Sequence, residues 1–379
     1  MRIGLITGEY PPMRGGIATQ VHILARELAE RGHSVHVMTD KRGNAHQDRI
    51  NLHPSITGWG INAVRGLIDW ARQNELDLLN IHYQTAAYGM SPWIHFLPEF
   101  VRPFPLITTF HDLRFPYLFP KAGSLRPWIV NRLARTSDGV TATNQEDHIH
   151  LQSVNKHNRL IPIGSSITTD SSSDANARRF IGADVDDFVI AFFGFVNHSK
   201  GLDMLIQSIA DLREKGIPAK LLMIGDRTGT ADATNAAYST EIDRLVADCD
   251  LGEMIRWTGF VEDADLKAYL QTTDVVVLPY RDGASYRRSS LTTAIDAGAA
   301  VVTTTPAVNV PTFRDRENMR LVTPNDTAAL TNALRELYNN PPRLASLRRG
   351  ALILRHEFGW ARITDAYIDF YRQVTEESV

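Results

Sequence analysis

Three basic side chains in the second half of the chain stand where predicted strands give way to predicted helices. Lys200 follows one apolar run, and Arg287 and Arg288 follow another at 275–278. The arginines lead directly into Ser289-Ser290-Leu291, where a short helical pattern begins. Arginine pairs, serine hydroxyls and the free N–H groups of a helix N-terminus together favour an anionic ligand such as a phosphate. Taken alone, Lys200 is better explained as a solvated lysine. For the arginine loop the alternative is an ordinary surface loop, and the strand-loop-helix context favours the phosphate site.

Two features of the first half also stand at the ends of predicted strands. Gly15 and Gly16 open a helix after the first strand, and His111 directly follows the apolar run at 106–110. Glycine lets a ligand approach the backbone closely, so an anion or a sugar fits there, although a tight turn without a ligand explains the same residues. The spacing is not the GxGxxG fingerprint of dinucleotide-binding dehydrogenases. A single histidine is usually structural, but the position of His111 favours a role in a cleft.

The elements that must position these residues alternate between apolar strands and amphipathic helices, a pattern that predicts a parallel sheet covered on both faces. Predicted strands lie at 3–7, 34–38, 78–82, 106–110, 139–143, 159–163, 189–193, 220–224, 255–258, 275–278 and 300–304. The clearest predicted helices lie at 21–28, 202–214, 327–338, 344–355 and 363–374.

The alternation is interrupted once, by a polar, serine-rich stretch at 168–174. We therefore predict two doubly wound α/β domains, one over residues 1–170 and one over residues 171–360. Ligands of such sheets bind at the carboxyl ends of the strands, so the expected site is a cleft between two facing domains.

Composition excludes several classes of protein. The 379 residues carry 40 Lys and Arg against 43 Asp and Glu, a formal charge of −3, which argues against a nucleic-acid partner. Cys249 is the single cysteine, so an intrachain disulfide and a cysteine metal cluster are excluded, and a reducing cytoplasm is the expected location. We see no apolar run long enough to cross a bilayer.

Two patterns suggest metal ligands, and we expect neither to bind a metal. Asp184-Val185-Asp186 resembles a manganese-binding DxD motif but lies before the strand at 189–193, away from the candidate sites, and is interpreted as a solvated turn. His148 and His150 lie two positions apart in a helical pattern, where side chains do not face one another.

The segment at 120–135 is basic and amphipathic. Its helix near 124–135 suits peripheral contact with an anionic membrane at the cytoplasmic face. The alternative, which we favour, is that Leu125, Ile129 and Leu133 pack into the helix's own domain.

Taken in order, short motifs along almost the whole chain resemble those of family 4 glycosyltransferases, which have the two-domain glycosyltransferase B fold. The motifs are Glu9-Tyr10-Pro11-Pro12 with Gly15-Gly16, Thr109-Phe110-His111-Asp112, Ile161-Pro162-Ile163-Gly164, Gly194 through Gly201, Ile224-Gly225-Asp226, Trp257-Thr258-Gly259-Phe260-Val261, Asp274 through Pro279, Gly298 through Val302, and Phe358-Gly359-Trp360.

The resemblance implies two Rossmann-like domains and a retaining, metal-independent hexosyltransferase without a cofactor. The second domain would hold a nucleotide sugar, with a UDP-sugar such as UDP-glucose favoured, and the first would present a glycan or lipid-linked acceptor. The final helix, at about 361–379, is expected to pack back on the first domain. The implied donor contacts are Gly16, Asn197, Lys200, Val261, Asp282, Arg287, Arg288, Ser289, Ser290, Leu291 and Thr293, and the implied acceptor-side contacts are Gly15, Gly16 and His111. Lys200 and His111 are the expected catalytic residues.

The chain departs from the family pattern at three donor contacts. Phe195 stands where similar enzymes have an arginine, and Ser285 and Thr293 stand at the two glutamates of their E-x7-E motif. Losing a hydrogen bond from arginine to a charged group costs about 1.5–3 kcal/mol, or about 10- to 100-fold in affinity. We predict that Arg288 or Arg287 supplies the missing cation, that Asp282 replaces a sugar-binding carboxylate, and that Thr293 still binds a ribose hydroxyl.

Two other functions fit parts of the sequence. A nucleotide-sugar epimerase on the same fold would need an acid–base pair, for which we find no convincing residues. A degenerate partner subunit, which binds a nucleotide sugar without turnover, would explain the missing glutamates. The retained Lys200, His111 and Gly15-Gly16 oppose this second alternative.

Overall fold

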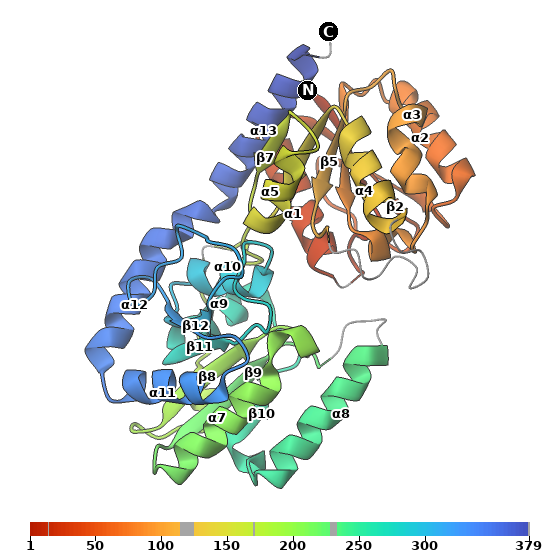
Figure 1. Cartoon of the computed structure of the whole chain (residues 1–379). Helices are drawn as coiled ribbons and strands as arrows, with labels where there is room; N and C mark the ends of the chain where they lie inside the picture. Colours follow the sequence, from red (N-terminus) through yellow and green to blue (C-terminus); the bar gives the residue numbers. More distant parts are fainter. Residues whose placement is uncertain (14, 114–124, 170, 228–232, 378–379) are drawn as a thin grey trace. The chain divides into compact units, whose positions relative to one another are not determined.

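The computed structural model describes residues 1–13, 15–113, 125–169, 171–227 and 233–377. Within them the chain forms two compact units, Met1–Ile163 with Trp360–Val379 and Gly164–Gly359 (Figure 1). Each unit has one parallel sheet with helices packed on it, so the predicted fold of two doubly wound, Rossmann-like α/β domains is confirmed.

The sheet of the first unit has seven described strands in the order β3-β2-β1-β4-β5-β6-β7. Their bounds are β1 Arg2–Thr7, β2 Ser34–Asp40, β3 Ile50–Ile56, β4 Leu78–Tyr83, β5 Leu106–Phe110, β6 Gly139–Ala142 and β7 Asn158–Leu160. The helices are α1 Gly16–Glu30, α2 Ile61–Gln73, α3 Leu97–Phe100, α4 Leu125–Thr136, α5 Gln145–Gln152 and α13 Trp360–Glu377. Side chains of α2, α3 and α4 share one apolar cluster with the sheet, and those of α1 and α13 share another, so both faces are covered.

The C-terminal helix α13 packs beside α1 on the first unit (Figure 1). Buried polar groups fix its position: the Tyr371 hydroxyl donates to Asn80 Oδ1 at 2.7 Å, and the Asn80 amide donates to Thr109 Oγ1 at 3.0 Å. Gly139 of β6 gives the helix room, because a Cβ there would lie 2.8 Å from Val374 Cγ2. Helix α13 therefore completes the core of the first unit.

The sheet of the second unit has six described strands in the order β10-β9-β8-β11-β12-β13. Their bounds are β8 Phe188–Phe193, β9 Ala219–Ile224, β10 Ile255–Trp257, β11 Val275–Leu278, β12 Val301–Thr304 and β13 Arg320–Val322. The helices are α6 Ala177–Ile181, α7 Leu202–Glu214, α8 Ala233–Asp248, α9 Asp263–Thr272, α10 Ser289–Asp296, α11 Thr327–Tyr338 and α12 Pro341–Leu354. The central strands β11 and β12 are buried along their whole length, as expected for a parallel sheet with helices on both faces.

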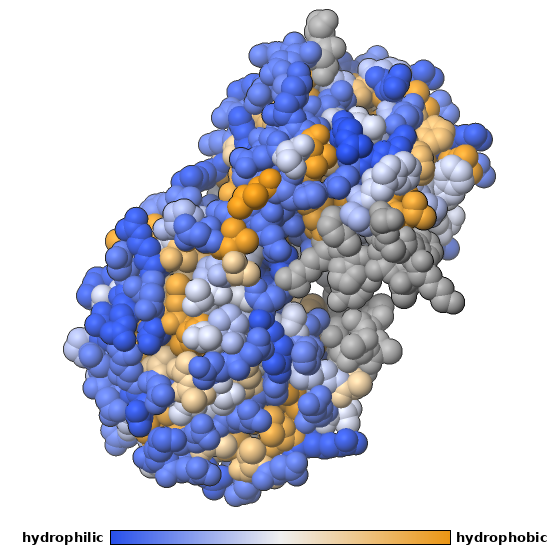
Figure 2. All heavy atoms as spheres, in the orientation of Figure 1, coloured by the Kyte–Doolittle hydropathy of each residue, from blue (hydrophilic) through white to orange (hydrophobic). Residues whose placement is uncertain are grey.

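The visible surface of both units is mostly hydrophilic, with hydrophobic residues in small patches (Figure 2). Large apolar side chains that remain exposed include Trp93, Leu125 and Trp128 of the first unit and Phe260 of the second.

Candidate functional site

The loop after β8 folds so that the Lys200 ammonium lies against the backbone of Gly194. Asn197 Oδ1 accepts a hydrogen bond from the Ser199 N–H at 2.8 Å and thereby caps the short 3-10 turn His198–Lys200. Gly194 has a φ of 111°, and a Cβ on it would lie 2.2 Å from Lys200 Nζ. Only glycine fits there without displacing the lysine, so this loop is shaped around the ammonium group.

The environment of Lys200 makes its charge sensitive to a ligand. Although part of the residue is accessible, its ammonium end lies 5.8 Å from the centre of the Phe192 ring, and Phe192 is fully buried. Burial, and secondarily the positive charge of Arg288, lower the pKa of Lys200 to about 7. A bound diphosphate would offset both effects and favour the charged lysine.

Arg287 and Arg288 both pair with Asp282 in the loop between β11 and α10. Arg287 Nη2 donates to Asp282 Oδ2 at 2.9 Å, and Arg288 Nη2 donates to Asp282 Oδ1. Their side chains are 8% and 16% exposed, respectively, so the pair of arginines is held inside the loop rather than in solvent. With one carboxylate between two guanidinium groups, the cluster keeps a net positive charge.

Arg288 is the arginine that the structure brings to the lysine loop. Its guanidinium lies 4.6 Å from the centre of the Tyr280 ring and donates to Ser199 Oγ at 3.4 Å. The neighbouring Arg281 joins the two loops further, because its backbone N–H donates to the Ser199 carbonyl at 2.9 Å and its side chain to the His198 carbonyl at 3.1 Å. Sequence reasoning missed Tyr280 and Arg281, which hold the basic loop against the 3-10 turn.

Helix α10 begins at Ser289, and its first turn closes the same cluster. Ser290 is buried and its hydroxyl bonds to the Tyr280 hydroxyl at 2.7 Å, while Ser290 Cβ lies 3.8 Å from the Cβ position of Gly194. The Leu291 side chain is fully buried in the core, which leaves only its backbone to face a ligand. Lys200, Arg288 and the positive end of an α-helix therefore gather at one place, an arrangement that suits a phosphate.

Thr293 has a partner within its own unit. It is fully buried, and its hydroxyl lies 2.9 Å from both the backbone N–H and the hydroxyl of Ser166. Thr292 likewise donates to the Gly164 carbonyl at 3.3 Å. Position 293 thus ties α10 to the segment that enters the second unit, and its predicted contact with a ribose stays a prediction.

A third loop of the second unit follows β10 at the predicted position of the base. The Gly225 N–H donates to Thr258 Oγ1 at 3.2 Å, and Gly225 pairs with Gly259 in an isolated bridge. Val261 is half-buried, whereas the Phe260 side chain is 62% exposed. The loop is therefore fixed to the end of β9, and a base contact at Val261 remains a prediction.

In the first unit, His111 forms a buried pair with His82. His111 Nε2 lies 3.1 Å from His82 Nδ1, and burial lowers the pKa of His111 to about 4 and that of His82 well below its usual value. His82 Nε2 has no hydrogen-bond partner within the described part of the chain. Because buried N–H groups without a partner are rare, we assign the shared proton to His82 Nδ1, which leaves the N–H of His111 on Nδ1. His111 is then a neutral donor.

The two glycines at the start of α1 differ in what surrounds them. Gly15 is the N-cap residue, and a Cβ on it would lie 2.4 Å from Glu9 Oε2. A Cβ on Gly16 would meet no described atom within 4 Å. Packing inside the chain therefore explains Gly15, while the open space over Gly16 is compatible with a ligand.

Comparison with known proteins decides the family. Residues 173–352 match the family described as Glycosyl transferases group 1, and residues 14–165 match the one described as Glycosyltransferase Family 4. The chain belongs to the family 4 glycosyltransferases. It is an enzyme that uses a nucleotide sugar, as predicted.

Its similarity to individual glycosyltransferases extends over most of the chain. It is 24% identical to alpha-monoglucosyldiacylglycerol synthase of Streptococcus pneumoniae, over 73% of this chain and 65% of that protein. It is 25% identical to D-inositol 3-phosphate glycosyltransferase of Xylanimonas cellulosilytica, over 96% and 92%. Among solved structures it resembles sucrose-phosphate synthase from Thermosynechococcus elongatus, with a TM-score of 0.77 and 19% identity over all of both chains. It also resembles Anabaena HepE in complex with UDP-glucose, with a TM-score of 0.75 and 18% identity over 100% and 99%.

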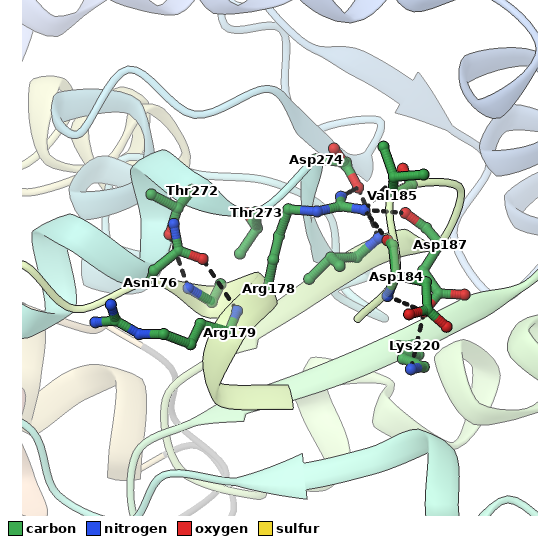
Figure 3. Close-up of polar contacts among 12 residues, drawn as sticks. Asn176, Arg178, Arg179, Asp184, Val185, Asp187, Lys220, Thr272, Thr273 and Asp274 are labelled. Carbon is green, nitrogen blue, oxygen red and sulfur yellow. Dashed lines mark hydrogen bonds and ion pairs between the residues drawn. The ribbon is translucent and has the colours of Figure 1, made fainter. Parts of the chain in front are cut away.

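In this glycosyltransferase the turn with the DxD-like pattern is held through its backbone, and the two histidines contact different side chains. Figure 3 shows the turn that contains Asp184 and Val185, where Arg178 donates to the Val185 carbonyl at 3.1 Å and pairs with Asp274 at 2.8 Å. Neighbouring Asp187 pairs with Lys220 at 2.8 Å. His148 and His150 contact different residues, Gln152 and Asn131. Among the described residues we find no group of three or more His, Cys, Asp or Glu side chains that could hold a metal ion.

The described part of the predicted membrane-contact segment is helix α4. Leu133 is buried and Ile129 packs partly against the core, but Leu125 is 64% exposed and Trp128 is 52% exposed. The expectation that Leu125 packs into the domain was therefore wrong, because the helix begins at this residue and its first turn extends beyond the core. Residues 120–124 of the segment lie outside the described residues. No described helix is both long and apolar enough to span a bilayer.

Proposed function

We propose that this glycosyltransferase moves a hexose from a UDP-sugar, with UDP-glucose favoured, to a glycan or lipid-linked acceptor and retains the anomeric configuration. The observation that carries the proposal is the convergence of Lys200, Arg288 and the N-terminus of α10 at the carboxyl ends of β8 and β11. These groups form a site for a diphosphate. The structural similarity to HepE, which was solved with UDP and with UDP-glucose, supports the choice of uridine.

In the proposed reaction the bond between the sugar C1 and the diphosphate oxygen breaks, and a bond from C1 to the acceptor oxygen forms on the same face. Negative charge develops on the diphosphate and positive charge on the sugar ring. Lys200, Arg288 and the N–H groups of α10 are fixed in advance around the leaving diphosphate and stabilise its charge. The acceptor proton moves to the leaving phosphate, so the reaction needs no protein base.

His111 acts on the sugar rather than as a base. A pKa of about 4 keeps its imidazole neutral at physiological pH, and its Nδ1–H can donate to a sugar hydroxyl. Asp282 is already bonded to both arginines and orients them, so we assign it to the donor site through Arg287 and Arg288. Gly16 supplies open space, and the Asn197 side chain holds the lysine turn.

The test is a panel of UDP-, GDP- and ADP-sugars, scored by thermal shift and by hydrolysis of the donor. We expect UDP-glucose to give the largest stabilisation and slow hydrolysis. Tighter binding of a GDP- or ADP-sugar would refute the choice of base. A protein that binds donors but neither hydrolyses them nor transfers the sugar to any of a set of glycosides and glycolipids would instead be the nucleotide-binding partner subunit. Net inversion of the anomeric centre, read by NMR, would refute retention.

We also propose that the enzyme works at the cytoplasmic face of a membrane and contacts it through α4. The exposed Leu125 and Trp128 lie in the first turns of this helix, which also carries Arg135, an exposed residue. Co-sedimentation with vesicles that contain anionic lipid tests the proposal. We expect Leu125→Ser with Trp128→Ser to reduce the bound fraction, and Leu352→Ser, at an exposed apolar site of the second unit, to leave it unchanged. Equal vesicle binding by the double variant and by Leu352→Ser would contradict a contact through α4.

A further inference from the structure

The first unit has a large pocket, and neither His82 nor His111 is among its described lining residues. Its volume is about 900 Å³, and it lies at the carboxyl ends of β2, β3 and β4. Its walls are formed by the end of β2, by the segment from the end of β3 into the first turn of α2, and by the segment after β4. They include Asp40, Arg42, Trp59, Asn62, Tyr88 and Trp93. This size suits a small organic ligand, and the position is the edge of a parallel sheet at which ligands bind.

The walls of the pocket are held together by their own hydrogen bonds. The Ser91 hydroxyl donates to the Trp59 carbonyl and accepts from the Trp93 N–H at 3.3 Å, so the loops after β3 and β4 are joined. The Trp59 ring packs edge-on against Tyr88, with centroids 4.7 Å apart. The Tyr88 hydroxyl shares its proton between the carbonyl oxygens of Ile6 and His82, each 3.0 Å away. The pocket is therefore preorganised and anchored to the ends of two strands.

The pocket adjoins the glycine loop that precedes α1. A Cβ on Gly8 would lie 2.0 Å from the carbonyl oxygen of Ala87, which lines the pocket. From the same loop, Glu9 approaches Gly15 and interacts electrostatically with Arg42, while burial raises its pKa. A ligand in the pocket would thus lie beside the loop of Gly15 and Gly16, on the side of the unit where the acceptor is proposed to bind.

The charges of the pocket favour a neutral ligand over an anion. Asp40 and Arg42 are the charged residues among its described walls, and they pair with each other, with Arg42 Nε 2.8 Å from Asp40 Oδ1 and Arg42 Nη2 3.2 Å from Asp40 Oδ2. Their net charge is zero, so the pair itself offers no excess positive charge to an anion. A phosphate would have to compete with Asp40 for the guanidinium, whereas hydroxyl groups can bond to both partners of the intact pair.

The remaining walls suit the two faces of a sugar ring. Trp93 is 39% exposed, so its indole offers a flat apolar surface to the C–H face of a ring. Among the described residues no side chain caps the first turn of α2, and its N–H groups around Asn62 can donate to hydroxyl oxygens. We propose that this pocket binds a neutral sugar or polyol ring of the acceptor, stacked on Trp93. The proposal rests on the proposed transferase function and specifies the chemistry of its acceptor.

The experiment compares neutral and anionic rings that are otherwise matched. Saturation-transfer NMR and titration measure binding of methyl α-glucoside and myo-inositol, and of glucose 6-phosphate and inositol 1-phosphate, to the full-length protein. We expect the wild-type protein to bind the neutral rings. Trp93→Ala should lower the affinity for these rings about tenfold or more, and Trp93→Phe should have an affinity between those of Trp93→Ala and the wild type. Trp128→Ala, which removes another exposed indole of the same unit, should keep wild-type affinity for the rings.

Three results would overturn the assignment: no binding of neutral rings by the wild-type protein, equal affinity in Trp93→Ala, or tighter binding of the phosphorylated rings that is lost in Arg42→Ala. Thermal unfolding of each variant checks that it is folded. UDP affinity of the wild-type protein is measured separately. Its absence would refute the proposed donor site without affecting the result for the pocket, so the two failures can be told apart.

Discussion

Lys200 provides the sharpest test of the donor site, because its proton should report the arrival of the diphosphate. In the ligand-free protein its pKa is about 7, set by burial and by Arg288. At pH 8 about one tenth of the molecules would then carry a charged lysine. A diphosphate beside Nζ restores the charged form, so binding of UDP at pH 8 should take up about 0.9 proton. At pH 6 the lysine is already charged, and its own contribution to the uptake should fall to about 0.1.

Isothermal titration calorimetry in buffers with different ionisation enthalpies measures this uptake directly. The phosphates of UDP are ionised at pH 8 and contribute little. Lys200→Met should abolish the proton uptake and lower the affinity for UDP about 10- to 100-fold, as expected for loss of one charge-assisted hydrogen bond. Lys215→Met, at an exposed lysine of the same unit, is the matched control and should behave as the wild type. An uptake near zero at pH 8 in the wild-type protein would refute the assignment of Lys200 to the diphosphate.

The same lysine should make the stability of the wild-type protein depend on pH. The unfolded chain binds the Lys200 proton up to a pKa of about 10.5, whereas the folded chain releases it near 7. The unfolded state therefore binds more protons between these values, and the free energy of unfolding rises with pH across that window. Between pH 7 and 9 the rise should exceed that of Lys200→Met by about 2 kcal/mol, measured by denaturant unfolding. A parallel pH dependence of the two proteins would contradict the assigned pKa.

Three further predictions concern single side chains. Gly194→Ala should lower UDP affinity at least about tenfold in calorimetry, because its Cβ would lie 2.2 Å from Lys200 Nζ. The control Gly252→Ala, where a Cβ would meet no described atom within 4 Å, should keep the wild-type affinity. Equal UDP affinities of the two variants would mean that the contact between Gly194 and Lys200 does not matter. His82→Leu removes the group that fixes the proton of His111, so kcat should fall with little change in UDP affinity. His82→Asn keeps an N–H near the position of Nδ1 and should recover part of the activity. If His82→Leu and His82→Asn have the same kcat, His82 does not position His111. Tyr371→Phe leaves buried Asn80 Oδ1 without this donor and should destabilise the first unit by about 1–3 kcal/mol in urea unfolding, with an unchanged midpoint as the contrary result.

Every described central strand was predicted, and so were the edge strands β7 and β10, whereas the edge strands β3 and β13 were missed. β3 contains Asn51, His53 and Pro54, and β13 has three residues, so neither shows an apolar run. Both are edge strands, where one side lacks a neighbour and polar residues or proline are tolerated. Among the predicted helices, α7 and α11 have the predicted bounds of 202–214 and 327–338.

At the site, sequence reasoning identified the residue types but not their partners. The contact of Thr293 with Ser166 joins positions 127 apart in the chain, and no local pattern reveals it. The His82–His111 pair was within reach, because both residues stand at the carboxyl ends of strands predicted to be consecutive. Pairing β4 with β5 would have placed them side by side. The pairing of both arginines with Asp282 depends on the fold of an irregular loop, which a strand-and-helix pattern does not specify.

Because α13 completes the core of the first unit, the order of synthesis and the order of folding cannot coincide. The ribosome makes β1 to β7, then the entire second unit, and only then the helix that covers one face of the first sheet. At roughly 5–20 residues per second, that face waits on the order of ten seconds or longer with Ile3, Leu5 and Ile107 lacking part of their cover. A nascent chain stalled before Trp360 should therefore bind chaperones through this surface, and the second unit, which is continuous in sequence, should become protease-resistant first.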